Sequence, residues 1–250
     1  MNVRAICCEI IYREACRLAA DSPLIVDLEF VPKGLHDIGS ERMLARLQER
    51  IDAVDPESYD VTIAGYALCN NGVVGLQATR TTLVLPRAHD CITFFMGSRQ
   101  RYREYFDAHP GTYFRTTGWS ERSSAREEEG VHTQLGYDKT YEEYVEKYGE
   151  DNAKYIWEVL GAWKSAYSRM TYINMGMRLD DEYAARARED AVANGWEFER
   201  IEGDWTLLGK LFQGDWDDED FLVVEPGDGV EASFDECILC RDSEKPRGQR

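Results

Sequence analysis

The sequence predicts an α/β fold with a largely parallel sheet flanked by helices. Short apolar runs bounded by turn residues alternate with segments of helical periodicity along most of the chain. The 250 residues are 43% hydrophobic, 12% aromatic and 30% charged, which is typical of a globular protein and excludes a disordered chain. These two observations favour a folded α/β protein with a sizeable core.

The alternation of strand and helix is clearest in residues 1–118 and again in residues 168–230. This suggests two Rossmann-like halves joined by a helical segment, 139–167, although the halves share no repeated sequence. We expect one α/β domain over residues 1–230, followed by a polar tail over residues 231–250.

In the first half, each predicted strand ends at a turn signal and each predicted helix has apolar residues at helical spacing. The second strand stops at Pro32 and Gly34, and Ser40 is a suitable N-cap for the helix that follows. The predicted strands span residues 3–8, 24–32, 59–69, 81–86 and 111–119. The predicted helices span residues 9–20, 42–54, a short segment from residue 73, and 93–111.

The second half contains the same alternation after a long polar stretch. Residues 140–167 have helical periodicity with a break near Gly149, and Gly195 is a C-terminal stop for a later helix. Residues 120–138 are polar and interrupted by Gly130 and Gly136, which fits either an excursion from the fold or a lid over the preceding strand ends. Further strands are predicted at residues 170–176, 196–203 and 220–227, and further helices at residues 182–195 and 206–214.

The charge of the chain excludes some classes of partner. The net charge is −18 and the isoelectric point is near 4.7, so the field of the whole chain repels nucleic-acid phosphates and anionic lipid headgroups. The sequence has neither a long uninterrupted apolar run nor a signal-peptide pattern. We therefore expect a cytoplasmic protein that binds neither nucleic acid nor membranes.

Three cysteines lie at matching places in the predicted fold. Cys8 ends the first strand, Cys69 ends the third, and Cys91 follows the fourth, so all three meet at the carboxyl edge of a parallel sheet. His36 and His89 follow strands at the same edge. Thiolates with imidazole nearby favour zinc, or an iron–sulfur cluster where sulfur dominates. We interpret Cys8, Cys69, Cys91 and His36 as metal ligands; the alternative for any single cysteine is inert packing.

The segment PRAHDC carries polar groups in the loop after the fourth strand. His89 and Asp90 are candidates for acid–base chemistry, and Arg87 for orienting a small anionic molecule. The alternative is a loop in which Arg87 and Asp90 form a surface ion pair and His89 bonds to a backbone carbonyl.

A possible anion or cofactor cradle directly follows Cys69 in the segment YALCNNG. The backbone N–H groups of Asn70, Asn71 and Gly72 could bind an anion there, although Asn-Gly is also a common turn former. Neither GxGxxG nor the phosphate-loop pattern GxxxxGK[ST] occurs in the sequence, so nucleotide-phosphate chemistry is disfavoured.

The tail contains one further cysteine motif, CILC, formed by Cys237 and Cys240. The spacing suits a redox pair or half of a zinc site, but zinc needs four ligands and no second CxxC occurs. We interpret this pair as a peripheral feature; the alternative is involvement in a disulfide or in metal binding.

The motifs CCEI, GLH, YALCNNG, LVLPRAHDCI and GTYFRTTGW resemble, in this order, those of the DUF1638 family of prokaryotic proteins. The resemblance places the motif residues of that family on Cys8, His36, Cys69, His89, Asp90 and Cys91. Members are often encoded near corrinoid-dependent methyltransferases, which implies a role in methyl transfer or one-carbon metabolism. The CILC motif is not part of the resemblance.

The leading hypothesis is a protein that binds zinc or an iron–sulfur cluster and acts on a small anionic molecule. If it is an enzyme, which the sequence leaves open, a metal-dependent transferase or lyase fits. One alternative is a non-catalytic accessory or binding protein of a methyltransferase or corrinoid protein, although the corrinoid-ligand pattern DxHxxG is absent from the sequence. Another is a cysteine-nucleophile hydrolase or transferase that uses Cys91 or Cys69 with His89.

Overall fold

The structure is a computed structural model, and the chain divides into two compact units. Unit 1 comprises Met1–Tyr102 and Gly203–Arg250, and unit 2 comprises Arg103–Glu202. The predicted helix at 140–167 and the polar stretch at 120–138 fall mostly outside the described residues. The structure describes residues 1–36, 39–69, 71–122, 142, 145–146, 149–150, 152, 154, 166–233 and 235–244.

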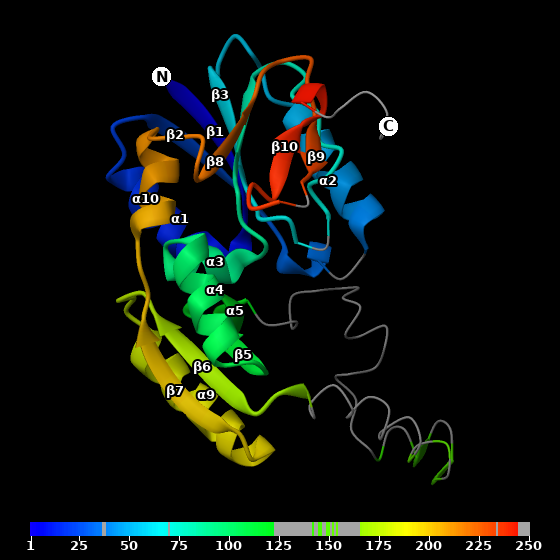
Figure 1. The fold of residues 1–250 in the computed structure, drawn as a ribbon, viewed down its shortest axis with the longest axis vertical. Coiled ribbons are helices and arrows are strands. Elements are labelled where there is room, and N and C mark those ends of the chain that lie inside the picture. The colour runs from blue at the N-terminus through cyan, green and yellow to red at the C-terminus, as the bar shows by residue number, and fades with distance from the viewer. Residues whose placement is uncertain are drawn as a thin grey trace. The chain divides into compact units, whose positions relative to one another are not determined.

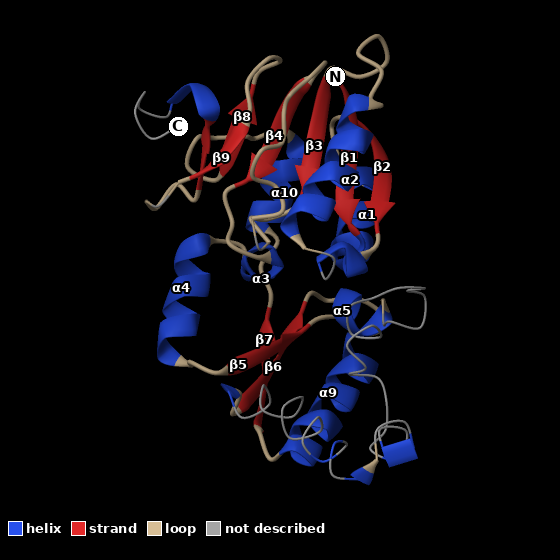
Figure 2. Ribbon diagram, turned by 90° about the vertical axis from the view of Figure 1, so that its right-hand side faces the viewer, coloured by secondary structure: helices blue, strands red, loops and turns tan. Residues whose placement is uncertain are grey.

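Unit 1 contains a five-stranded sheet in the order β2-β1-β3-β4-β8. The first four of these strands run parallel, and β8 pairs antiparallel with β4 (Figures 1 and 2). The predicted mixed α/β fold with a largely parallel sheet is therefore confirmed, whereas two Rossmann-like halves are not. The strands are β1 (Asn2–Cys8), β2 (Ile25–Val31), β3 (Val61–Gly65), β4 (Thr82–Pro86) and β8 (Phe221–Val224).

The burial of the strands follows their place in the sheet. The central strand β3 has the sequence VTIAG and every residue in it is buried, as expected for a parallel strand covered on both faces. The edge strand β2 is mostly exposed or half-buried. The apolar core of unit 1 therefore lies around β1, β3 and β4.

Helices cover both faces of this sheet. After the short helix η1 (Glu9–Ile11), α1 (Tyr12–Ala20) packs against α10 (Thr206–Gln213). Figure 1 shows these two helices on one side of the sheet and α2 (Ser40–Asp52) on the other. The chain thus passes from β1 to β2 across one face, and from β2 back to β3 across the other. The carboxyl ends of β1 and β3 consequently form a topological switch point, which is where open α/β sheets bind ligands.

Three predicted elements between residues 59 and 111 differ from the structure. The strand predicted at 59–69 ends at Gly65, and residues 71–75 form turns instead of the helix predicted from residue 73. The helix predicted at 93–111 is divided into α3 (Cys91–Met96) and α4 (Arg99–Ala108). The break falls at Gly97, whose φ of +78° is left-handed and cannot continue a helix.

The described part of the tail is folded against itself. The strand β9 (Val230–Ala232) pairs antiparallel with β10 (Leu239–Arg241), and the short helix η5 (Asp242–Glu244) follows. This hairpin contains both cysteines of the CILC motif.

Unit 2 contains a three-stranded parallel sheet in the order β5-β6-β7. Its helix α9 (Asp180–Asn194) packs on β6 and β7 through small side chains and ends at Gly195, as predicted. The strand predicted at 111–119 is shorter and leads into α5 (Thr117–Glu121). The strands are β5 (Thr112–Arg115), β6 (Arg169–Asn174) and β7 (Glu197–Glu202). Among the described residues, no helix is long and apolar enough to cross a membrane.

Candidate functional site

Three cysteines lie at or after the carboxyl ends of three neighbouring parallel strands of unit 1. Cys8 is the last residue of β1, Cys69 lies four residues after the end of β3, and Cys91 is the first residue of α3, after β4. Cys8 and Cys69 therefore flank the switch point between β1 and β3. We define these three residues as the cysteine edge of unit 1.

The thiols of the cysteine edge influence one another. Burial raises the pKa of the Cys8 thiol, and the nearby Cys91 raises it further. Burial likewise raises the pKa of the Cys69 thiol, and Cys8 adds to this effect. Cys8 and Cys69 are therefore neutral thiols near pH 7 in the free protein, and they would have to lose protons to bind a metal ion.

The backbone at Cys69 has an uncommon conformation. Its φ is +44°, in the left-handed region that non-glycine residues rarely adopt. Two hydrogen bonds hold this loop beside the loop after β4: Leu68 N–H donates to the Ala88 carbonyl at 2.8 Å, and Cys69 N–H donates to the His89 carbonyl at 3.1 Å. Such conformations persist where the surrounding structure fixes them, often at functional sites.

Asp90 fixes the start of the helix that carries Cys91. One of its carboxylate oxygens accepts a bond from the Ile92 N–H at 2.9 Å, which makes it the N-cap of α3. The other accepts a bond from the Tyr102 hydroxyl at 2.7 Å. Nothing in the sequence singles out Tyr102, which belongs to an ordinary helical segment. His89, directly before Asp90, is exposed.

Arg87 is buried and bonds to the protein's own backbone. Its Nε donates to the carbonyl of Phe221 at 3.0 Å, and its Nη1 donates to the carbonyls of Cys237, at 3.2 Å, and of Leu239. These contacts tie the end of β4 to β8 and β10. They support a structural role for Arg87, and none of them supports the predicted role in orienting an anion.

The predicted cradle after Cys69 is explained largely by turn geometry. Asn71 is exposed with a φ of +65°, and Asn70 lies outside the described residues. The Gly72 N–H donates to the carbonyls of Leu68 and Cys69. A Cβ atom on Gly72 would lie 2.2 Å from the sulfur of Met43, so close packing against α2 accounts for this glycine.

The residue types of the cysteine edge suit a metal ion, but the distances between their side chains do not. Within the described ranges, no three histidine, cysteine, aspartate or glutamate side chains are grouped closely enough to hold a metal ion. His36 is the last residue of the short helix η2 (Lys33–His36), and its side chain lies outside the described residues. Three thiols at one edge are nevertheless a donor set that soft metals prefer, and they would have to approach one another to share an ion.

A hollow of about 400 Å³ lies elsewhere in unit 1, lined in part by Arg4, Glu29, Arg50 and Tyr59. Ion pairs cross it: Glu29 contacts the Arg4 guanidinium at 2.6 Å and the Arg50 guanidinium at 3.3 Å. Because Glu29 already pairs with both arginines, we interpret the hollow as a solvated ion-pair groove.

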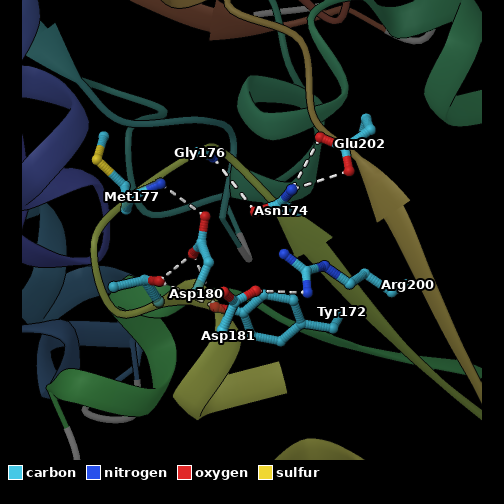
Figure 3. Close-up of polar contacts among 9 residues, drawn as sticks. Tyr172, Asn174, Gly176, Met177, Asp180, Asp181, Arg200 and Glu202 are labelled. Carbon is cyan, nitrogen blue, oxygen red and sulfur yellow. Dashed lines mark hydrogen bonds and ion pairs between the residues drawn. The ribbon is translucent and has the colours of Figure 1, made fainter. Parts of the chain in front are cut away.

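Unit 2 has its own polar cluster at the carboxyl end of β6, shown in Figure 3. The buried carboxylate of Asp180 accepts hydrogen bonds from the Tyr172 hydroxyl at 2.9 Å, from the Met177 N–H at 2.7 Å and from the Thr117 hydroxyl. Burial raises the pKa of the Tyr172 hydroxyl, so it stays protonated and serves as a donor. These bonds fix the start of α9.

The neighbouring groups in Figure 3 are also paired with one another. Asn174 donates to both carboxylate oxygens of Glu202 at 2.8 Å and accepts a bond from the Gly176 N–H, and Arg200 bonds to the exposed Asp181 at 2.8 Å. A network in which the polar groups bond to one another is typical of a structural cluster, and we assign it no ligand.

The fold and the cysteine edge together define an α/β protein with thiols at the switch point of its main sheet. A family model described as Protein of unknown function (DUF1638) matches residues 30–212, and the chain belongs to this family. The matched residues include Cys69 and Cys91, whereas Cys8 precedes them. Comparisons with curated proteins and with solved structures find no match.

Proposed function

We propose that the protein binds a soft metal, as zinc or an iron–sulfur cluster, at the cysteine edge and uses it to act on a small anionic molecule. The observation that carries this proposal is the arrangement of Cys8, Cys69 and Cys91 after three adjacent parallel strands, with Cys8 and Cys69 flanking the switch point. We further propose methyl transfer or one-carbon metabolism as the context, on the resemblance of the motifs alone.

The donor chemistry of the cysteine edge suits this role. Cys8, Cys69 and Cys91 would hold the metal, with His36 as a fourth ligand, and the metal would supply Lewis acidity or a docking point for a thiolate. Asp90 and Tyr102 contribute by fixing the first turn of α3, which also fixes the backbone of Cys91. Because the thiols are neutral in the free protein, metal binding must release protons and must strengthen as the pH rises.

Two other functions are kept as alternatives. A cysteine nucleophile is less favoured, because burial raises the pKa of the Cys69 thiol and the free thiolate would be scarce near pH 7. An accessory protein that binds a methyltransferase or corrinoid protein would form a stable complex and turn over no small molecule.

Metal and acid-labile sulfide analysis of protein purified without oxygen tests the proposal. We expect stoichiometric zinc without colour, or iron and sulfide in a brown protein, and loss of most of the metal in Cys69→Ala with an unchanged circular-dichroism spectrum. Cys237→Ala is the matched control, because this exposed cysteine lies outside the cysteine edge. Full metal occupancy in Cys69→Ala would contradict the ligand assignment, and metal-free wild-type protein would favour the alternatives.

A further inference from the structure

The CILC motif forms a turn in which the two apolar side chains are buried and the two cysteines are more exposed to solvent. Ile238 and Leu239 are 3% and 0% exposed, whereas Cys237 is exposed and Cys240 is half-buried. The two apolar side chains thus anchor the turn in unit 1, and the two cysteines remain nearer the solvent. The motif lies beyond residues 30–212, so it is a feature outside the family match.

The backbone reverses direction between the two cysteines. The Leu239 N–H donates to the Cys237 carbonyl at 2.6 Å, which closes a three-residue γ-turn around Ile238. Ile238 has a φ of +65°, a conformation that is rare and strained for a β-branched residue. Beyond the turn, Cys240 continues into β10 and pairs with Glu231 of β9.

Two side chains, one of them distant in sequence and one local, hold this turn in place. Arg87 donates through Nη1 to the carbonyls on both sides of Ile238, those of Cys237 and Leu239. On the other side, the Cys237 N–H donates to the Asp235 carboxylate at 2.8 Å. The backbone carrying both cysteines is therefore fixed before any bond forms between them, which lowers the entropy cost of joining them.

We propose that Cys237 and Cys240 are a reversible dithiol–disulfide site that exchanges with small disulfides such as glutathione disulfide. The Cys237 thiolate attacks one sulfur of the small disulfide, the sulfur–sulfur bond of that molecule breaks, and one small thiol leaves. The Cys240 thiolate then attacks the Cys237 sulfur, forms the internal disulfide and releases the second small thiol. In total the protein loses two electrons and two protons, and the two small thiols that are released carry them.

The exchange is tested on the full-length protein with glutathione alone as the probe. The protein is equilibrated anaerobically with an about tenfold excess of glutathione disulfide over glutathione, quenched with acid and analysed by mass spectrometry with peptide mapping. We expect the wild-type protein to lose the mass of two hydrogens, with the internal bond mapped between Cys237 and Cys240. Adding excess glutathione should restore both thiols.

Variants that each lose one cysteine distinguish a Cys237–Cys240 disulfide from disulfides between other cysteines. Cys240→Ser should stop at a mixed disulfide with glutathione on Cys237, and Cys16→Ser, which removes a cysteine of α1, should still form the internal bond. The proposal is overturned if the wild-type protein carries only mixed disulfides with glutathione on Cys237 and Cys240. It is equally overturned if the internal bond maps to other cysteines and persists in Cys237→Ser.

Discussion

The seven cysteines of the chain differ in exposure and therefore in expected reactivity. Burial raises the pKa of Cys69, so its thiolate is scarce near neutral pH, whereas Cys237 is exposed. We predict that iodoacetamide modifies Cys237 at least about 100-fold faster than Cys69 in metal-free protein at neutral pH. Timed alkylation followed by peptide mass spectrometry measures both rates in one sample.

Unfolded protein provides the control for this comparison, because both cysteines should react at similar rates in denaturant. Faster alkylation of Cys69 than of Cys237 in the folded protein would show an activated thiolate. That outcome would favour the cysteine-nucleophile alternative over metal binding.

Two adjacent aspartates of unit 2 provide a matched pair for testing the network in Figure 3. Asp180 is buried and accepts bonds from Tyr172, Thr117 and Met177, so Asp180→Ala leaves buried donors without their acceptor. We predict a loss of about 3 kcal/mol or more in the free energy of unfolding. Urea denaturation followed by circular dichroism measures it.

The control variant is Asp181→Ala. The Asp181 side chain is 89% exposed and pairs only at the surface with Arg200, so we predict a loss below about 1 kcal/mol. Equal losses in the two variants would mean that the buried network does not stabilise unit 2.

At the scale of the elements, Gly97 separates α3 from α4 for two physical reasons. Its φ is +78°, and a Cβ atom there would lie 2.5 Å from the Asp204 side chain. We predict that Gly97→Ala lowers the free energy of unfolding by about 2 kcal/mol or more. Thermal and urea unfolding of the variant check this value.

Gly209 is the matched control, since it lies within α10 with open space where a Cβ atom would be. Gly209→Ala should raise the free energy of unfolding by about 0.5–1 kcal/mol, because alanine favours a helix interior. A stabilising Gly97→Ala would contradict the described break between α3 and α4.

The elements that the sequence predicts well are those decided by local pattern. The apolar runs of β1, β2 and β4 and the helix α9 with its terminal glycine follow from periodicity and turn residues. The antiparallel direction of β8 and the pairing of β9 with β10 depend on partners elsewhere in the chain. The sequence predicts the end of β3 too late, because the apolar residues after Gly65 continue the pattern of a buried strand.

In the candidate site, too, some features can be predicted from local sequence and others depend on long-range packing. The positions of Cys8, Cys69 and Cys91 at the carboxyl ends of neighbouring strands follow from the parallel order and are predictable from the sequence. The partners of Arg87 were not, because they are backbone carbonyls more than a hundred positions away in the sequence. Local sequence gives the type of a side chain and its strand, but long-range packing decides what the side chain contacts.

At the scale of the whole molecule, buried thiols should make stability depend on alkaline pH. Burial raises the pKa of Cys7 from 9.0 to about 12 and also raises the pKa values of Cys8 and Cys69. These groups hold their protons longer when folded, so their contribution is complete below about pH 9 and is lost as the pH rises through the folded pKa. We predict that metal-free protein loses about 4 kcal/mol from Cys7 alone between about pH 9 and pH 12.

Urea denaturation at increasing pH measures this loss, and Cys7→Ala should show a shallower dependence from a lower starting stability. A free energy of unfolding that stays constant or rises between about pH 9 and pH 11 would contradict the described burial of Cys7 and Cys8.

The most direct test of the metal site is X-ray absorption spectroscopy at the edge of the bound metal in protein purified without oxygen. If the metal is zinc, we predict a shell of about three sulfur ligands at roughly 2.3 Å that loses sulfur in Cys69→Ala. If it is an iron–sulfur cluster, we predict iron bound mainly by sulfur, with the cluster lost in Cys69→Ala. A shell of nitrogen and oxygen ligands alone, or a sulfur shell unchanged in Cys69→Ala, would contradict metal binding at the cysteine edge.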